Sequence, residues 1–283
     1  MRLVWQLLAI VAVSFLGGQA VMLVDGNPWL TLVTGLLTAV AGVLVYGWVV
    51  RRTERRPSDE VSLKGAGPGL SLGTLLGLTL FGMVIVNIAF LGHYTVDGLG
   101  SPMNAVGLLG FMAAAATTEE VMYRGVLFRI IEGWTGTWIA LGLTSLVFGL
   151  SHLFNPNASL WGAIAIAIEA GTMLTAAYVA TRKLWVPIGL HFGWNIAGSA
   201  LFSTEVSGNN TPQGLLDAVM SGPAIITGGD FGPEASVYSM VFCVLTAVVF
   251  MWIAYRRGTV VPTSRAARSA RADQTDATAT LPR

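Results

Sequence analysis

Apolar runs long enough to cross a lipid bilayer occupy most of this 283-residue chain. A membrane-spanning helix needs roughly 20 apolar residues in succession. Runs of about that length lie at about 3–24, 29–50, 69–92, 104–128, 138–154, 159–181, 184–203 and 236–255. Only 11% of the residues are charged, whereas about 25% is usual in soluble domains. We therefore predict an all-α, polytopic helical membrane protein with about eight transmembrane helices.

The basic residues indicate which side of the membrane each loop faces, because Lys and Arg collect in short cytoplasmic loops. The opposite loops, 25–28, 93–103, 155–158 and 204–235, contain neither residue type. We therefore predict that both termini are cytoplasmic and that the protein is a multi-pass protein of the plasma membrane. The first run also has features of a cleavable secretory signal, an alternative that leaves the later topology unchanged.

The pattern divides the chain into four regions. We expect two transmembrane helices and a charged cytoplasmic linker, then a transmembrane core, then an outer loop with the last transmembrane helix, and finally a disordered cytoplasmic tail. Their bounds are 1–68, 69–203, 204–257 and 258–283. In the core, Gly69, Gly73 and Gly77 recur every four residues and predict close helix packing.

The long outer loop, 204–235, contains a short amphipathic stretch around 215–220. A lid or a helix on the membrane surface is one interpretation of it, and an ordinary connecting loop is the other.

Charge and cysteine content exclude some partners. The formal net charge of +1 provides no basic surplus for binding nucleic acid. Cys243 is the single cysteine of the sequence, so neither a disulfide framework nor a cysteine metal cluster is available. The expected partners are the lipid bilayer and a membrane-associated peptide or protein.

Ionisable side chains inside apolar runs are costly, so they indicate function. Helical rise places Glu119 roughly 18 Å from the cytoplasmic end of its run, and His152, His191 and Asn195 roughly 20, 10 and 16 Å from that side. These depths predict one buried polar pocket that collects side chains from three helices. The whole group comprises Glu119, Glu120, Arg124, His152, Glu169, His191 and Asn195.

Helical spacing assigns different surroundings to the two adjacent glutamates. Glu120 and Arg124 are four residues apart and share a face, whereas Glu119 projects about 100° away. The spacing therefore predicts that Glu120 is neutralised by Arg124 and that Glu119 is left free.

A carboxylate that is desolvated in a membrane is suited to act as a general base and then as a general acid. Glu119 is placed to take a proton from water, nearby histidines to orient that water or stabilise the product, and the Asn195 amide to stabilise an oxyanion. No Gly-x-Ser-x-Gly motif lies in the runs that carry these residues, which argues against a serine nucleophile. The sequence requires no cofactor, although Glu119, His152 and His191 also permit zinc or another divalent metal.

Three short motifs occur in order: Glu-Glu-x-x-x-Arg at 119–124, Phe-x-x-x-His at 148–152 and His-x-x-x-Asn at 191–195. Together they resemble the CPBP family of intramembrane proteases, which includes type II CAAX prenyl endopeptidases and bacterial Abi proteins of the bacteriocin-immunity type. The resemblance covers about residues 104–203.

The resemblance implies catalytic roles for four residues. Glu119 would activate the attacking water together with His152, while His191 and Asn195 would stabilise the oxyanion. Glu120, Arg124 and Phe148 would support the site. The implied activity is an intramembrane endopeptidase acting on membrane-associated substrates, prenylated or CAAX-like substrates among them.

Two other functions are compatible with the residues. In a proton-coupled transporter, Glu119, Glu169 and the histidines would form a proton relay. A non-catalytic immunity-type membrane protein would retain the pocket as structure. Glu169 lies outside the three motifs, and we expect it either to line the cavity or, in its protonated form, to pair with a polar group such as Thr172 or Thr175.

Overall fold

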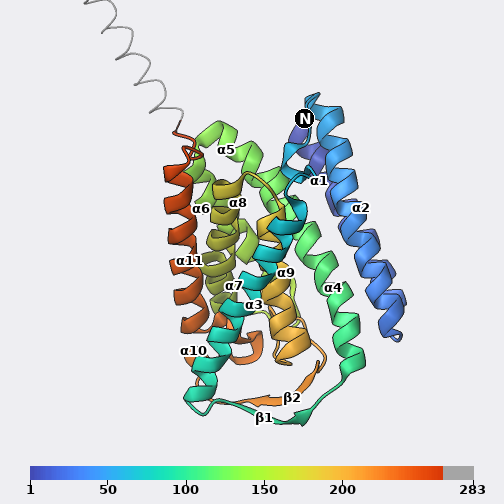
Figure 1. Cartoon of the computed structure of the whole chain (residues 1–283), viewed down its shortest axis with the longest axis vertical. Helices are drawn as coiled ribbons and strands as arrows, with labels where there is room; N and C mark the ends of the chain where they lie inside the picture. The colour runs from blue at the N-terminus through green and yellow to red at the C-terminus, as the bar shows by residue number, and fades with distance from the viewer. Residues whose placement is uncertain (264–283) are drawn as a thin grey trace, which may run out of the picture.

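The computed structural model describes residues 1–263, and seven helices within them are long and apolar enough to cross a membrane (Figure 1). The chain is therefore a multi-pass membrane protein, as the apolar runs predict. These candidate spans are α1 (Arg2–Leu23), α2 (Pro28–Glu54), α3 (Ala66–Phe90), Pro102–Thr135, Thr137–Phe154, Leu160–Thr181 and α11 (Val237–Arg256).

Three of the spans are assembled from several helical pieces, two of them with a π-helical turn. Such turns are rare and occur frequently at functional sites. The pieces are α4 (Pro102–Glu120), π-turn η2 (Val121–Phe128), α5 (Arg129–Thr135), α6 (Thr137–Ser151), 3₁₀ turn η3 (His152–Phe154), α7 (Leu160–Ile166), π-turn η4 (Ala167–Gly171) and α8 (Thr172–Thr181).

The seventh predicted span, 184–203, is shorter than expected. Residues 184–203 form α9 (Trp185–Ile196, 12 residues) and the π-turn η5 (Ala197–Leu201, 5 residues), so seven helices rather than eight qualify as spans by length and composition among the described residues. Nearly every side chain of α9 is buried, because α9 packs against α3, α4 and α8 in the interior of the bundle (Figure 1). A helix surrounded by protein does not need to match the full thickness of the hydrocarbon layer.

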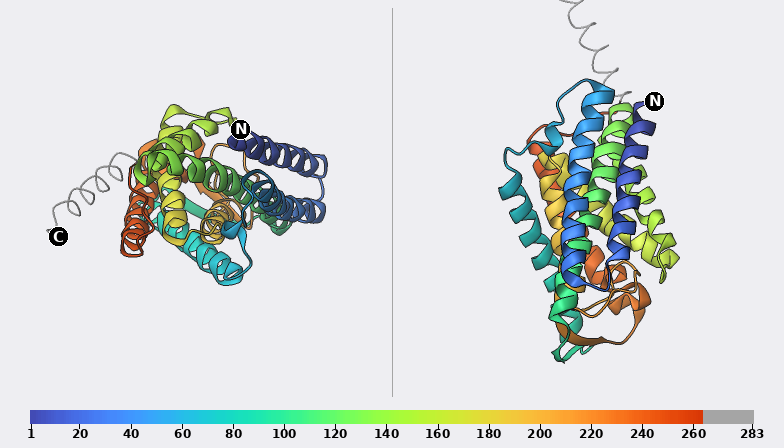
Figure 2. Two further views of the ribbon diagram at one scale, coloured as in Figure 1. Left: turned by 90° about the horizontal axis from the view of Figure 1, so that it is seen from above. Right: turned by 90° about the vertical axis from the view of Figure 1, so that its right-hand side faces the viewer.

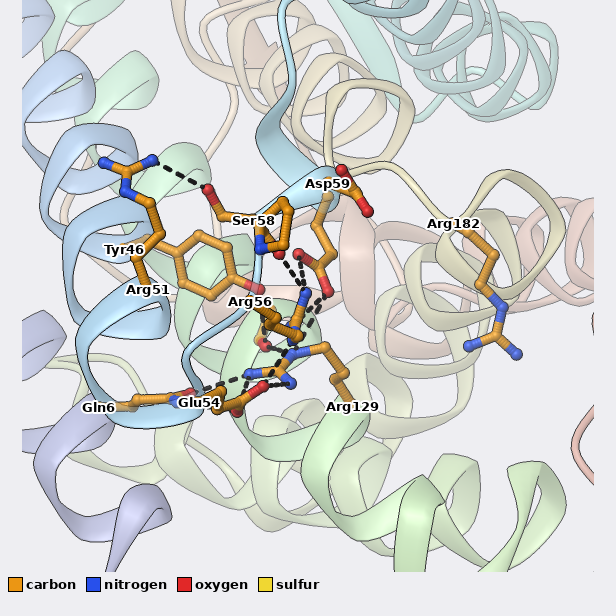
Figure 3. Close-up of polar contacts among 12 residues, drawn as sticks. Gln6, Tyr46, Arg51, Glu54, Arg56, Ser58, Asp59, Arg129 and Arg182 are labelled. Atoms are coloured by element: carbon orange, nitrogen blue, oxygen red, sulfur yellow. Dashed lines mark hydrogen bonds and ion pairs between the residues drawn. The ribbon is translucent and has the colours of Figure 1, made fainter.

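One end of the bundle holds a cluster of charged residues, and Figure 3 shows the contacts among them. The Arg129 guanidinium donates to Glu54 at 2.8 and 2.9 Å and to Gln6 at 2.9 Å, and Arg56 pairs with Glu54 and Glu60. The N-terminus and the last turn of α11 lie at this same end (Figures 1 and 2). The first and last helices of the bundle therefore begin and end on one side, and the cytoplasmic location of that side stays a prediction.

The opposite end is closed by a two-stranded antiparallel sheet. Strand β1 (Tyr94–Leu99) pairs with β2 (Leu216–Met220), with a bulge between Val96 and Gly98. The amphipathic stretch at 215–220 is thus mostly a strand, not a surface helix or a plain loop, because its backbone groups pair with the loop that follows α3. The outer segment continues through α10 (Ala224–Thr227) and the 3₁₀ turns η6 (Gly229–Phe231) and η7 (Pro233–Ala235).

Two further segments lie at the basic end of the bundle. A 3₁₀ turn, η1 (Asp59–Val61), follows α2. Residues 258–263, expected to begin a disordered tail, are instead hydrogen-bonded to the bundle: the Thr137 N–H donates to the Val261 carbonyl, and the Val261 N–H donates to Thr137 Oγ1. The rest of the predicted tail, 264–283, lies outside the described residues.

The glycines of α3 allow α9 to approach closely, which confirms the predicted ridge. A Cβ atom at Gly73 would lie 2.3 Å from the carbonyl oxygen of Val186, and one at Gly77 would lie 2.3 Å from that of Leu190. At Gly69 the nearest atom would be 3.0 Å away. Close packing of small residues substitutes for the hydrophobic effect between helices in lipid, and it fixes α9 with its site residues.

Replacing one of these glycines is expected to loosen the bundle. Gly77→Ala forces α3 and α9 apart, so the free energy of unfolding in detergent micelles should fall by about 1–3 kcal/mol. Gly82→Ala is the matched control, because no atom lies within 4 Å of a Cβ at Gly82. Chemical unfolding of both variants, followed by circular dichroism, checks the prediction, and an equal loss in the two variants would contradict it.

Candidate active site

A cavity of about 230 Å³ lies between α1, α4, α6 and α9. Residues of the outer loops, among them Asn155, contribute to its wall, so it occupies the half of the bundle away from the basic end. The four residues predicted to be catalytic all line it: Glu119, His152, His191 and Asn195. The fold therefore brings together side chains that are up to 76 positions apart, from Glu119 to Asn195 (195 − 119).

The adjacent glutamates have different surroundings, as their helical positions predict. Glu120 is fully buried, and its Oε1 lies 2.7 Å from Nη1 of Arg124. The Glu119 side chain is 30% exposed and faces the cavity. The predicted ion pair is confirmed, and of these two glutamates Glu119 is the one without an arginine or lysine partner among the described residues.

Arg124 is held by polar contacts that extend beyond Glu120. Its Nη2 donates to the carbonyl oxygens of Ala170 and Gly171 at 3.0 and 3.2 Å, and its Nε donates to Thr175 Oγ1 at 3.3 Å. Its guanidinium carbon lies 4.5 Å from the centre of the Phe148 ring. A buried charge is tolerated when it is paired and hydrogen-bonded, and these contacts tie η2 to η4 and α8.

His191 lies between the two glutamates. Its Nδ1 is 3.0 Å from Glu120 Oε1, and its Nε2 is 3.9 Å from Glu119 Oε2. Because the ionised Glu120 carboxylate only accepts hydrogen bonds, we assign the Nδ1 hydrogen to this contact. The second nitrogen, Nε2, then faces the cavity beside Glu119.

His152 is fixed in one tautomer by the backbone. Its Nδ1 lies 2.8 Å from the carbonyl oxygen of Phe148, and a carbonyl can only accept, so Nδ1 carries the hydrogen. In the neutral imidazole, Nε2 is then an acceptor. The Phe148 ring packs edge to face against His152 at 4.9 Å and against His191 at 6.2 Å between ring centres, which orients both imidazoles.

Asn195 lines the cavity, and among the described residues its side-chain amide has no hydrogen-bond partner. Its side chain is buried to 7% exposure, and its backbone carbonyl accepts from Ser199 Oγ at 2.7 Å. The π-turn η5 begins two residues later. An unpaired amide in this position is available to a substrate oxygen.

The donor set does not form a recognisable metal site. Within the described part of the chain, no group of three or more His, Cys, Asp or Glu side chains is arranged to hold a metal ion. His191 Nδ1 is engaged by Glu120, and His152 Nδ1 by a backbone carbonyl. These contacts leave Nε2 of each histidine and the Glu119 carboxylate as the groups that would hold a divalent metal. Zinc therefore stays a prediction, and no catalytic step is routed through a metal.

Glu169 is neither in the cavity nor paired as expected. It is fully buried in η4, and both of its carboxylate oxygens are without a hydrogen-bond partner among residues 1–263. The hydroxyl of Thr172 donates to the Ile168 carbonyl, and Thr175 accepts from Arg124. Glu169 is absent from the cavity wall, and no hydrogen bond among the described residues joins its carboxylate to Thr172 or Thr175.

The sequence-based reasoning missed Glu234, a buried carboxylate in η7 behind the cavity. It accepts hydrogen bonds from Trp194 Nε1 at 2.9 Å and from Ser207 Oγ at 2.7 Å, as well as from the Ser207 N–H. Burial raises the pKa of Glu234, and these hydrogen bonds oppose that rise. Glu234 thus joins the outer segment to the residue preceding Asn195, a contact that no local sequence pattern indicates.

Removing this carboxylate is expected to destabilise the outer half of the bundle. Glu234→Ala leaves the donors of Trp194 and Ser207 without their acceptor, so the free energy of unfolding should fall by about 1–3 kcal/mol. Asp230→Ala is the matched control, since Asp230 is an exposed acid in the same segment. Thermal unfolding in detergent measures the difference, and identical curves for the two variants would refute it.

The fold and the cavity together define a class: a multi-pass membrane protein whose helical bundle encloses a polar site with a free carboxylate and two histidines. Residues 101–197 match the family model described as Rce1-like, type II CAAX prenyl endopeptidase. This segment is similar to the Rce1-like domain of the CPBP family, and that similarity indicates a protease that acts on a protein substrate. Comparisons with curated proteins and with solved structures each found no match.

Proposed function

We propose that the protein is an intramembrane endopeptidase of the plasma membrane that hydrolyses peptide bonds with water activated by Glu119. This proposal rests on one observation, the different surroundings of the two adjacent glutamates. Arg124 neutralises Glu120, whereas Glu119 faces a cavity that His152, His191 and Asn195 also line.

In the first step, Glu119 takes a proton from a water molecule whose oxygen attacks the scissile carbonyl carbon. His152 Nε2 accepts a hydrogen bond from the same water and orients it, consistent with the tautomer that its backbone contact imposes. The carbonyl π bond opens, and the electron pair moves to the oxygen, forming a tetrahedral oxyanion.

In the second step, the oxyanion collapses. The Asn195 amide donates to it, and His191 in its imidazolium form donates from Nε2 while Nδ1 stays bound to Glu120. The C–N bond breaks, and protonated Glu119 returns its proton to the leaving amine. The products are a carboxylic acid and an amine, and Glu119 ends as the carboxylate with which it began.

The test is hydrolysis by the reconstituted full-length protein. A mixture of membrane-associated peptides, a prenylated CAAX peptide included, is incubated in ¹⁸O-water and analysed by mass spectrometry. We expect new carboxyl termini that carry one ¹⁸O, and no acyl-enzyme that hydroxylamine can trap. A trapped acyl-enzyme would overturn the activated-water mechanism, and an absence of cleavage would overturn the function.

Asn195→Ala should reduce kcat about 10²–10³-fold, as does the loss of an oxyanion-hole donor elsewhere. KM should change little, because the oxyanion exists only after attack. Asn87→Ala provides the control, since its amide bonds to a carbonyl of α3 away from the cavity. Steady-state kinetics on a cleaved peptide separate the two parameters, and a change confined to KM would refute this role.

A further inference from the structure

A second cavity, of about 350 Å³, adjoins the candidate active site. Its walls come from the end of α1, the start of α2, the first turns of α4 and residues 209–212. The two cavities share Phe111 and Asn209 as wall residues. The two cavities are therefore immediate neighbours, separated by these two side chains.

The second cavity lies at the end of the bundle opposite the N-terminus and the last turn of α11. Its rim includes Asp25 in the turn between α1 and α2, and that turn is far from the N-terminus in Figure 1. The basic residues gather at the other end. Because basic residues mark the cytoplasmic side, we expect this entrance to face the extracytoplasmic side.

Asp25 is the charged residue in the wall of this cavity. The loops at the same end of the bundle, 25–28, 93–103, 155–158 and 204–235, contain no Lys or Arg but contain six acids. Asp25 is exposed, and its carboxylate forms no hydrogen bond or ion pair with any other described residue. A cationic side chain of a ligand would be its natural partner.

The remaining walls suit an extended polypeptide. Asn104, Asn210 and Thr211 supply amide and hydroxyl groups that can pair with backbone N–H and C=O groups. Val21 and Leu108 supply apolar surface beside them. This mixture of a few polar groups on an apolar wall is typical of binding clefts.

We propose that the second cavity is the substrate entrance, and that it binds an extended, extracytoplasmic segment of a membrane protein carrying a basic residue. The proposal rests on the endopeptidase function above and specifies its substrate. A lipid-anchored tail on the cytoplasmic face would have to reach the catalytic cavity from the basic end. The proposal therefore predicts a class of substrate that differs from such tails.

The first test uses single cysteines at the entrance, which is feasible because Cys243 is fully buried. Met22→Cys lies in the cavity wall, and Leu23→Cys lies beside it, outside the wall and at a position that is 86% exposed. Intact cells are treated with a bulky, membrane-impermeant maleimide, and the purified proteins are then assayed on a peptide that the wild type cleaves. Both cysteines should react, and only the labelled Met22→Cys protein should lose activity, by at least about tenfold if its entrance is filled.

A cysteine at the basic end controls for sidedness. Arg52→Cys is at an exposed position there and should react only after the cells are permeabilised. The reverse pattern, with Arg52→Cys labelled in intact cells and Met22→Cys protected, would overturn the extracytoplasmic entrance.

The second test exchanges the charge at the rim. Two cleaved peptides that differ only by Lys or Glu on the entrance side of the scissile bond are compared by kcat/KM. The wild type should favour the Lys peptide about two- to fivefold, the range for an exposed ion pair, and Asp25→Lys should reverse the preference. Equal preferences in the two proteins would refute the basic-residue specificity.

The outcomes separate this inference from the function on which it rests. If the wild type cleaves peptides but labelled Met22→Cys remains fully active, the entrance is wrong and the endopeptidase stands. If the wild type cleaves nothing, the endopeptidase fails and the entrance proposal falls with it, whatever the labelling pattern.

Discussion

Glu119→Gln is expected to abolish measurable peptide hydrolysis while leaving the protein folded. Glutamine has nearly the same shape but accepts no proton at neutral pH, so the attacking water loses its general base. Such a loss typically costs about 10²–10⁴-fold in rate. The measurement is the initial rate of peptide cleavage by the reconstituted variant, with thermal unfolding recorded on the same preparation.

Glu169→Gln is the matched control for this substitution. Glu169 is a fully buried carboxyl group inside the membrane bundle, but it lies outside the catalytic cavity. The same isosteric change should therefore leave the rate unaltered. Activity retained in Glu119→Gln, or lost equally in both variants, would remove Glu119 from its proposed role.

Arg124→Met is expected to have the largest effect on stability. It leaves the Glu120 carboxylate buried at 0% exposure without its 2.7 Å partner, and it leaves the Ala170 and Gly171 carbonyls without their donor. Breaking a buried ion pair by removing one partner typically costs about 3–5 kcal/mol. Chemical unfolding in detergent, or the yield of folded protein where the variant does not accumulate, measures this loss.

The double variant Glu120→Gln with Arg124→Met distinguishes charge from packing. It removes both charges together, and replacing a whole buried pair is often close to neutral. We expect it to recover most of the stability lost in the single variant, with the side-chain oxygen of the introduced glutamine still accepting a hydrogen bond from His191. A double variant no more stable than Arg124→Met would show that the carbonyl contacts, not the ion pair, dominate.

Much of the fold is predictable because membrane helices have a strong local signal. The apolar runs locate seven spans to within a few residues, except where the fourth continues through η2 and α5 to Thr135. The length of α9 was not predictable from its own apolar run, because it depends on the helices that surround it. The strands β1 and β2 are also non-local, since residues 94–99 pair with a segment more than 100 positions away.

The candidate site is predictable to the extent that it depends on helical spacing and on the cost of buried charge. Those two arguments place Glu120 against Arg124 and Glu119 apart from it, as observed. The catalytic roles of Glu119, His152, His191 and Asn195 stay predictions. Glu234 was not predicted, because its contact is a hydrogen bond from the indole of Trp194. No sequence motif links that tryptophan to an acid of the outer loop.

The Phe148 ring has a consequence for how the site responds to pH. The face of the ring contacts the Arg124 guanidinium, and the ring also packs against both imidazoles. A phenyl group has no ionisable proton, so the Phe148 ring that packs against both histidines stays uncharged at every pH. Acidification can therefore change the protonation of the reacting groups without dismantling the aromatic scaffold that holds them in position.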